Sequence, residues 1–217
     1  SLLPIVSAAS DRFKGDVAMS DWRCYYEETL YPLPDGVLSC VKNSGTRFFL
    51  TGGTALSRGF FNHRYSDDLD LFLSKDPDYP GQTDALLQAL IGGGFQINTE
   101  SMLRSPDYVS CYIRRLSDEN YSLKVDLVND TAPQFGGPVD TPVYFRTDSW
   151  ENILSNKLCA LLRLEPKDVA DIWIISKKKA FNWGRALDQA REKELGLDPV
   201  VLSDVLRGIP EDEFARI

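Results

Sequence analysis

The chain is poor in sulfur and imidazole ligands, with four cysteines and one histidine among 217 residues. The cysteines show no CxxC spacing and no dense framework. This distribution favours reduced thiols in a cytoplasm over a disulfide scaffold. No apolar run is long enough to span a bilayer, and the N-terminus lacks a basic region followed by an apolar one. We therefore expect a cytoplasmic protein with no membrane partner.

Basic residues are also in deficit, since 24 Lys and Arg stand against 32 Asp and Glu, for a net charge of −8. This balance argues against a broad electrostatic footprint for nucleic acid, although it leaves room for a local basic groove. A hydrophobic content of 43% with 26% charged residues is ordinary for a soluble globular protein.

Periodicity predicts an α+β fold, in which a small mixed β-sheet is flanked by helices and followed by a helical C-terminal region. The expected boundary divides residues 1–147 from residues 148–217. Helices are expected at residues 21–30, 35–43, 54–61 and 83–91, with breaks at Pro32 and Pro34. Strands are expected at residues 47–51, 69–73, 95–99, 108–116, 122–129 and 143–145.

Asp68 and Asp70 raise the first chemical question, because they flank Leu69 in what otherwise resembles a buried strand. Residues i and i+2 of a strand project to the same face, so the two carboxylates project together. Like charges this close favour a neutralising cation, and Mg²⁺ prefers carboxylate and phosphate oxygens. The alternative is a strand end where both acids face water.

A third carboxylate, Asp126, lies in the strand expected at residues 122–129 and shares a face with Lys124. From a neighbouring strand it could complete a two-metal site. The alternative is an ion pair between Lys124 and Asp126.

Gly52 and Gly53 stand between an expected strand and an expected helix, where the backbone can approach a phosphate closely. The surrounding sequence is neither GxxxxGK[ST] nor GxGxxG, which excludes an ordinary P-loop and disfavours a dinucleotide fold. Ser57 could reach a phosphate from the following helix, whereas Arg58 is expected to face solvent. Arg64, next to the single histidine, could also hold a triphosphate.

Lys157 interrupts an apolar helical stripe between Ile153 and Leu161. A lysine there needs a partner, or must extend its ammonium to an edge. Asp168 and Asp171 follow at helical i, i+3 spacing and could cap a helix, pair with Arg163 or Lys157, or act as a base. Lys177, Lys178 and Lys179 are interpreted as a solvated face.

A set of motifs in this order resembles those of the AbiEii-type nucleotidyltransferases: Gly52-Gly53, Asp68-x-Asp70, Lys124-x-Asp126, Glu151 with Lys157 and Arg163, and Lys167-Asp168 with Asp171. That family includes toxins of type IV toxin–antitoxin systems and belongs to the polymerase-β-like superfamily. The resemblance spans residues 48–175. It implies that Asp68, Asp70 and Asp126 hold Mg²⁺ or Mn²⁺, and that Asp126, Lys157 and Asp168 are catalytic. It also implies that Gly52, Gly53 and Ser57 hold the triphosphate. Together with Arg64 and Ser66 they form the expected nucleotide-binding set.

The resemblance implies metal-dependent transfer of a nucleoside monophosphate from an NTP to a hydroxyl of an acceptor such as tRNA or a protein, with an antitoxin as partner. A small-molecule nucleotidyltransferase of the antibiotic-modifying kind shares the first motifs, and the acidic charge suits a cationic acceptor. The third alternative is a non-catalytic nucleotide-binding partner module.

Overall fold

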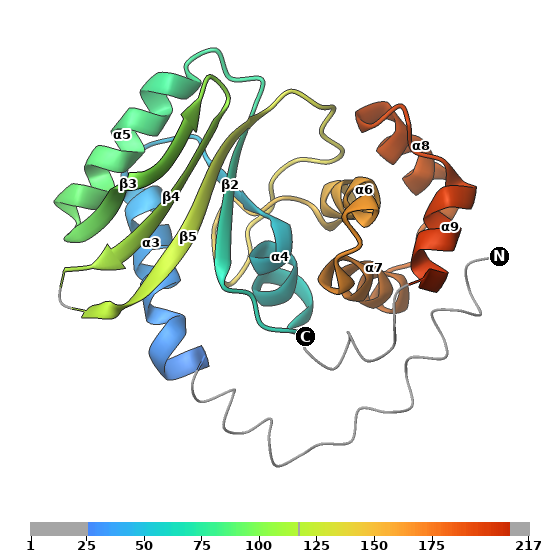
Figure 1. Ribbon diagram of the computed structural model, residues 1–217, viewed down its shortest axis with the longest axis horizontal. Coiled ribbons are helices and arrows are strands. Elements are labelled where there is room, and N and C mark those ends of the chain that lie inside the picture. Colours follow the sequence, from blue (N-terminus) through green and yellow to red (C-terminus); the bar gives the residue numbers. More distant parts are fainter. Residues whose placement is uncertain (1–25, 117, 209–217) are drawn as a thin grey trace. The chain divides into compact units, whose positions relative to one another are not determined.

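The computed structural model describes residues 26–116 and 118–208. They divide into two compact units (Figure 1). The sheet unit comprises residues 26–132 and 137–148, and the helical unit comprises residues 133–136 and 149–208. The sequence-based boundary after residue 147 remains a prediction about domains, and the α+β fold class is confirmed.

The sheet unit is built on five strands in the order β1-β2-β5-β4-β3. Their bounds are β1 Phe49–Thr51, β2 Asp68–Ser74, β3 Phe95–Ser105, β4 Tyr108–Arg115 and β5 Asp118–Asp130. Strands β2 and β5 are parallel, and the other neighbours are antiparallel. The last strand in sequence therefore lies in the middle of the sheet.

Helices of the sheet unit are η2 Tyr26–Leu30, α3 Pro32–Asn43, α4 Gly52–Thr54, η3 Ala55–Phe61 and α5 Tyr79–Gly92. Figure 1 shows α3 and α5 together on one face of the sheet. The expected break between the first two helices is present, but it lies at Tyr31 and not at Pro32 and Pro34, because α3 already begins at Pro32. Proline suits a first helical turn, where its missing N–H would have no intrahelical acceptor. Residues 21–25 of the first expected helix lie outside the described residues.

The expected strand at residues 143–145 was also wrong. The Tyr144 carbonyl accepts the Thr141 N–H at 3.2 Å and the Thr147 hydroxyl at 2.8 Å. These local bonds fold the segment into bends, and Thr147 forms isolated bridges with Leu50 and Val139. The backbone groups that a strand would use are thus satisfied within the segment.

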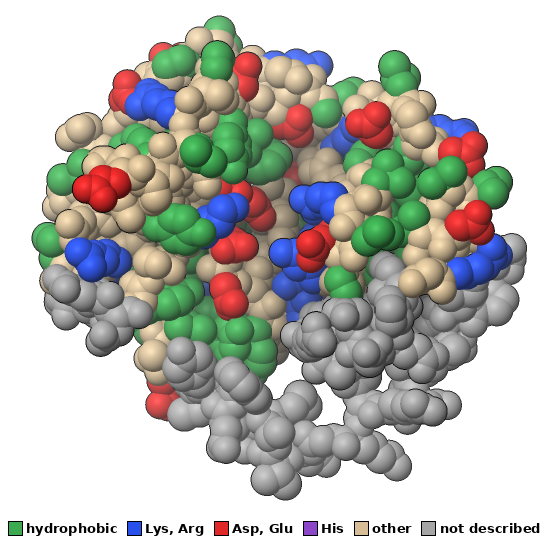
Figure 2. All heavy atoms as spheres, viewed as in Figure 1, with side chains coloured by type: hydrophobic (Ala, Val, Ile, Leu, Met, Phe, Trp, Pro, Cys, Tyr) green, Lys and Arg blue, Asp and Glu red, His purple; other side chains and the backbone are tan. Residues whose placement is uncertain are grey.

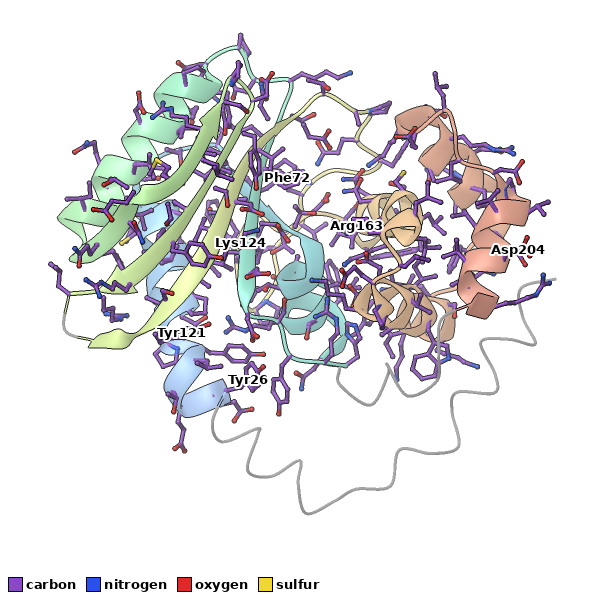
Figure 3. The ribbon with its side chains drawn as sticks, in the orientation of Figure 1. Tyr26, Phe72, Tyr121, Lys124, Arg163 and Asp204 are labelled. Atoms are coloured by element: carbon purple, nitrogen blue, oxygen red, sulfur yellow. The ribbon has the colours of Figure 1, made fainter. Side chains whose placement is uncertain are left out.

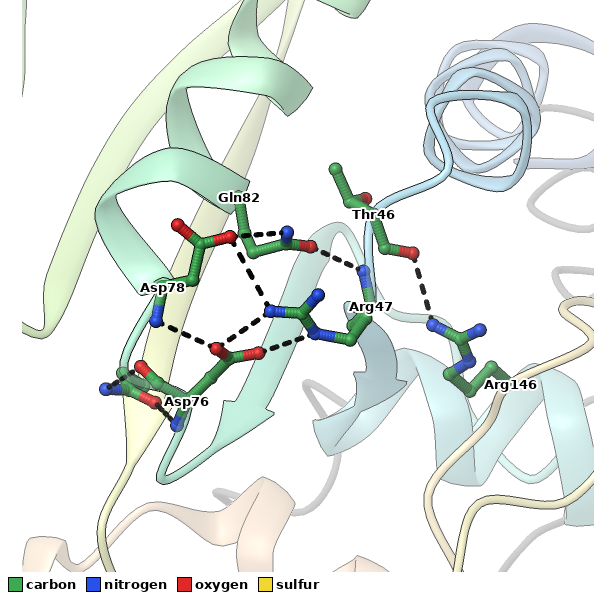
Figure 4. Close-up of polar contacts among 7 residues, drawn as sticks. Thr46, Arg47, Asp76, Asp78, Gln82 and Arg146 are labelled. Atoms are coloured by element: carbon green, nitrogen blue, oxygen red, sulfur yellow. Dashed lines mark hydrogen bonds and ion pairs between the residues drawn. The ribbon is translucent and has the colours of Figure 1, made fainter.

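Arg47, just before β1, joins that strand to the start of α5 (Figure 4). Its guanidinium meets both oxygens of Asp76 at 2.8 and 2.9 Å, and its N–H donates to Gln82 Oε1 at 2.9 Å. The Arg47 hydrogen bonds hold the pKa of Asp76 below its usual value. The network fixes how α5 leaves the sheet.

The helical unit contains α6 Trp150–Ala160, η4 Leu161–Arg163, α7 Pro166–Lys178, α8 Trp183–Lys193 and α9 Pro199–Gly208. Ser149 caps α6 by accepting the Asn152 N–H at 3.1 Å, and Asn182 caps α8 by accepting the Arg185 N–H at 3.0 Å. In the described part of the chain, no helix is long and apolar enough to cross a membrane.

Stability should fall in alkali because of Cys111, which lies in β4 and is 1% exposed. Burial, with a smaller contribution from the Asp126 charge, raises the pKa of its thiol to about 11 from a usual 9. The folded state thus favours the neutral thiol, a contribution present below about pH 9 and lost by about pH 11. We expect about 2–3 kcal/mol less unfolding free energy at pH 11 than at pH 9 from this residue, measured by urea denaturation. The unfolding free energy of the Cys111→Ala variant should decline less steeply with pH than that of the wild type. An identical decline in the two proteins would contradict the role given to Cys111.

Candidate active site

Three carboxylates meet on one face of the two parallel strands in the sheet. In the register of β2 and β5, Asp70 is opposite Asp126 and Asp68 is opposite Lys124. The alternate residues Leu69, Leu71, Val125 and Leu127 are fully buried on the other face. The period-two pattern thus places the acids together. Figure 3 labels Lys124 of β5, which the register pairs with Asp68.

The glycine turn reaches this carboxylate face. Gly52 has a φ of +69°, and a Cβ built on it would lie 1.9 Å from Asp70 Oδ2. A Cβ on Gly53 would lie 2.3 Å from Arg64 Nη2 and 3.1 Å from Ser66 Oγ. The structure therefore brings Gly52 against the predicted metal ligand Asp70, and Arg64 and Ser66 against the adjacent Gly53.

We expect Gly52→Ala to destabilise the fold strongly, because it adds a left-handed φ for alanine to a collision with Asp70. Gly45→Ala is a matched control, since Gly45 has a φ of +72° with nothing within 4 Å of a built Cβ. The control should cost about 1–2 kcal/mol of unfolding free energy, and Gly52→Ala clearly more. Adding Asp70→Gly to Gly52→Ala should recover the difference. Equal losses for the two alanine variants in denaturant titrations would show that Asp70 does not press on the turn.

Two hydroxyls of the helix after the glycines hold the backbone of the site. Ser57 is fully buried, and its hydroxyl donates to the Arg64 carbonyl. The Thr54 hydroxyl donates to the Asp68 carbonyl at 2.5 Å. These bonds fix where Arg64 and Asp68 lie, and a phosphate contact of Ser57 stays a prediction.

Arg58 does not face solvent, so that expectation was wrong. Its side chain is only 14% exposed and pairs with Asp35 at 2.7 Å. Its guanidinium also lies 4.1 Å from the centre of the Tyr31 ring. Asp35 of α3 and Tyr31, which lies between η2 and α3, therefore bury a cation that the local sequence places on a surface.

Asp126 is already engaged on this face. Lys124 Nζ lies 2.6 Å from one oxygen, and the Tyr108 hydroxyl donates to the other at 3.2 Å. Burial alone would lower the pKa of Lys124, but the hydrogen bond and charge of Asp126 outweigh burial and raise it. The ion pair expected as the alternative is thus present.

The oxygen donors fit a hard divalent cation. Asp68 and Asp70 share a face beside the glycine turn, the arrangement in which Mg²⁺ takes carboxylate and phosphate oxygens together. Among the described residues, no three His, Cys, Asp or Glu side chains form a group able to hold a metal ion. Because Lys124 is paired with Asp126, the fit to a divalent cation rests on Asp68 and Asp70. The role of Asp126 as a third ligand stays a prediction.

Lys157, in the helical unit, has carboxylate partners. Its side chain is 10% exposed, and its ammonium lies 2.7 Å from Asp168 and 2.6 Å from Asp171. Both carboxylates are fully buried, and Asp168 also accepts from Arg163 at 2.9 Å. Of the sequence-based alternatives, the structure shows pairing within α6 and α7 and not a lysine reaching to solvent. The catalytic assignments of Lys157 and Asp168 stay predictions.

Residues 37–209 match the family described as "Nucleotidyl transferase AbiEii toxin, Type IV TA system". The chain belongs to this AbiEii family. It is accordingly a nucleotidyltransferase by family, and the resemblance noted in the sequence is confirmed. No curated protein matches it significantly.

Solved structures share the AbiEii-family chain's fold. JHP933 from Helicobacter pylori is 19% identical, with a TM-score of 0.55 over 86% of this chain and 91% of its own. A candidate nucleotidyltransferase of Helicobacter pylori is 20% identical, with a TM-score of 0.56 over 87% of this chain and 96% of its own. At these identities the likeness concerns the fold.

Sequence patterns missed two supports of the candidate site in this AbiEii-family chain. The Thr51 hydroxyl, next to the glycines, donates to the buried Asp148 carboxylate at 2.7 Å, across 97 residues of chain. Tyr65 stacks on Tyr26 with ring centres 4.0 Å apart, beside Arg64 and Ser66 in sequence. Tyr26 also neighbours Tyr121 of β5 (Figure 3), and burial raises its pKa. Such long-range contacts leave no local periodic signal.

Proposed function

We propose that this chain transfers a nucleoside monophosphate from an NTP to an acceptor hydroxyl on RNA or a protein, with Mg²⁺ or Mn²⁺ held by Asp68 and Asp70. The observation that carries the proposal is the contact between the Asp70 carboxylate and the Gly52 turn. It joins a candidate metal ligand to a backbone that a phosphate can approach closely. Family membership supports nucleotidyl transfer in general.

Each residue has a defined part in this proposal. Gly52 and Gly53 admit the triphosphate, and Arg64 and Ser66, both beside Gly53, donate to its oxygens. The divalent cation would neutralise charge on the triphosphate and on the pyrophosphate that leaves. Asp126 would accept the proton of the acceptor hydroxyl once Lys124 no longer holds its carboxylate.

Lys157 and Asp168 enter the proposal through the family's later motifs. A positioned cation facing developing negative charge commonly supplies several kcal/mol, and Asp168 would hold the Lys157 ammonium in one orientation. The reaction would take place in the cytoplasm. An antitoxin would be the regulatory partner, as the family description of a type IV TA system suggests.

A small-molecule acceptor is the second candidate, favoured by the acidic balance of the chain, which suits a cationic aminoglycoside. One experiment separates the candidates. The protein is incubated with each of four α-labelled NTPs and Mg²⁺ or Mn²⁺, with bulk tRNA, the protein itself and aminoglycosides offered as acceptors. Label on RNA or protein supports the proposal, and label on an aminoglycoside supports the second candidate. No label on any acceptor from a folded protein overturns both.

A further inference from the structure

Residues 172–187 of the helical unit differ in charge from the rest of the chain. This stretch contains no Asp or Glu, but it holds Lys177, Lys178, Lys179 and Arg185. More broadly, residues 149–208 carry ten Lys and Arg against nine Asp and Glu, in a chain with 24 against 32. Figure 2 shows acidic and basic side chains interspersed over the face it views, without a broad basic field. The cations of residues 172–187 are therefore a local feature.

Aromatic rings lie beside two of these cations, Lys177 and Lys179, and Lys177 Nζ is 5.9 Å from the centre of the Trp173 ring. Trp150, Phe181 and Trp183 form a chain of contacts with ring centres 6.1 and 4.8 Å apart. Lys179 Nζ lies 5.6 Å from the centre of the Trp150 ring. Each ring is half-buried, whereas Lys177 and Lys178 are exposed. We call Trp150, Lys177, Lys178, Lys179, Phe181 and Trp183 the aromatic–lysine surface.

The start of α8 adds a second observation. A helix N-terminus carries partial positive charge and commonly has Asp or Glu in its first turn. The first turn of α8 has no acid and instead contains the exposed Arg185. A cation at the positive end of a helix is unfavourable unless an anion lies nearby, so this end of α8 suits an anionic partner.

We propose that the aromatic–lysine surface binds single-stranded RNA. Lysines along a chain contact the phosphates, and half-exposed rings stack bases, which is how proteins bind single strands without reading sequence. RNA also offers the hydroxyls that the proposed reaction needs. An anionic membrane fits less well, because none of the three rings is among the exposed large hydrophobic side chains that could insert into lipid. The idea that this surface binds the acceptor of the reaction rests on the proposed function. The idea that it binds RNA does not.

Binding to a labelled 15-nucleotide single-stranded RNA, without NTP, tests the surface by fluorescence anisotropy over a range of salt concentrations. Lys177→Gln with Lys178→Gln should weaken binding about tenfold at 0.1 M salt and lower the salt slope by about 1.4. The matched control is Lys42→Gln with Lys75→Gln, two exposed lysines of the sheet unit whose loss changes net charge equally. The control should bind as the wild type does. Trp183→Leu should weaken binding about tenfold at every salt concentration without changing the slope.

Several outcomes overturn the inference. One is wild-type protein that does not bind this RNA, and another is equal loss in both lysine pairs. A third is that Lys177→Gln with Lys178→Gln weakens binding to vesicles with 30% anionic lipid but leaves binding to RNA unchanged. Transfer from α-labelled NTP to the same RNA is measured separately. Binding without transfer would count against the proposed function alone, whereas transfer unaffected by Lys177→Gln with Lys178→Gln would count against the aromatic–lysine surface alone.

Discussion

Asp68→Asn combined with Asp70→Asn should reduce nucleotidyl transfer at least about a thousandfold, because a bound metal supplies several kcal/mol of charge stabilisation. The two side chains lie on the carboxylate face of β2, opposite buried leucines. Asparagine keeps the shape of the side chain and removes its charge, so the variant should remain folded. Transfer is measured with labelled NTP, and folding by denaturant titration.

The matched control replaces Asp84 and Asp107, two exposed acids of the same unit, by asparagine. It changes the net charge equally and should leave transfer within about twofold of wild type, as expected for surface substitutions away from a site. Nucleotidyl transfer that survives in the Asp68 and Asp70 variant would contradict the proposed metal site. Loss of folding in that variant would instead give the two carboxylates a structural role.

Lys157→Met should lose both transfer and stability. Methionine would preserve the apolar packing of the α6 stripe, but two fully buried carboxylates lie on this ammonium. Removing one partner of a buried ion pair leaves uncompensated charge and costs about 3–5 kcal/mol. Denaturant titration should therefore show a large loss. Lys124→Met, whose lysine side chain is 34% exposed, should cost under about 1 kcal/mol.

Stability and catalysis can be separated at Lys157. Adding Asp168→Asn and Asp171→Asn to Lys157→Met removes the buried charges together and should recover most of the lost stability. Asp168→Asn alone, which leaves Lys157 paired with Asp171, shows what the Asp168 charge contributes to transfer. If the refolded triple variant and the Asp168→Asn variant both transfer at the wild-type rate, Lys157 and Asp168 are structural only.

Local periodicity predicted the parts of the site that depend on one strand or one helix. Leu69 and Leu71 are buried while Asp68 and Asp70 share the other face, as alternation requires. Parallel pairing of Asp70 with Asp126 could not be predicted, because register between distant strands depends on the whole sheet. Arg58 was placed wrongly for a similar reason, since its partners Asp35 and Tyr31 lie more than twenty residues earlier in the chain, at the start of α3 and just before it.

The central position of β5 has a consequence for the order of events during synthesis. Asp68 and Asp70 emerge from the ribosome well before Asp126, and β5 must insert between β2 and β4 before the three acids share a face. Pairing of such distant segments is slow, because the intervening chain must be ordered first. A nascent chain that ends before residue 118 therefore has both acids of β2 but lacks the strand that completes the face. Its chemistry would begin only after β5 has left the ribosome and the sheet has closed around it.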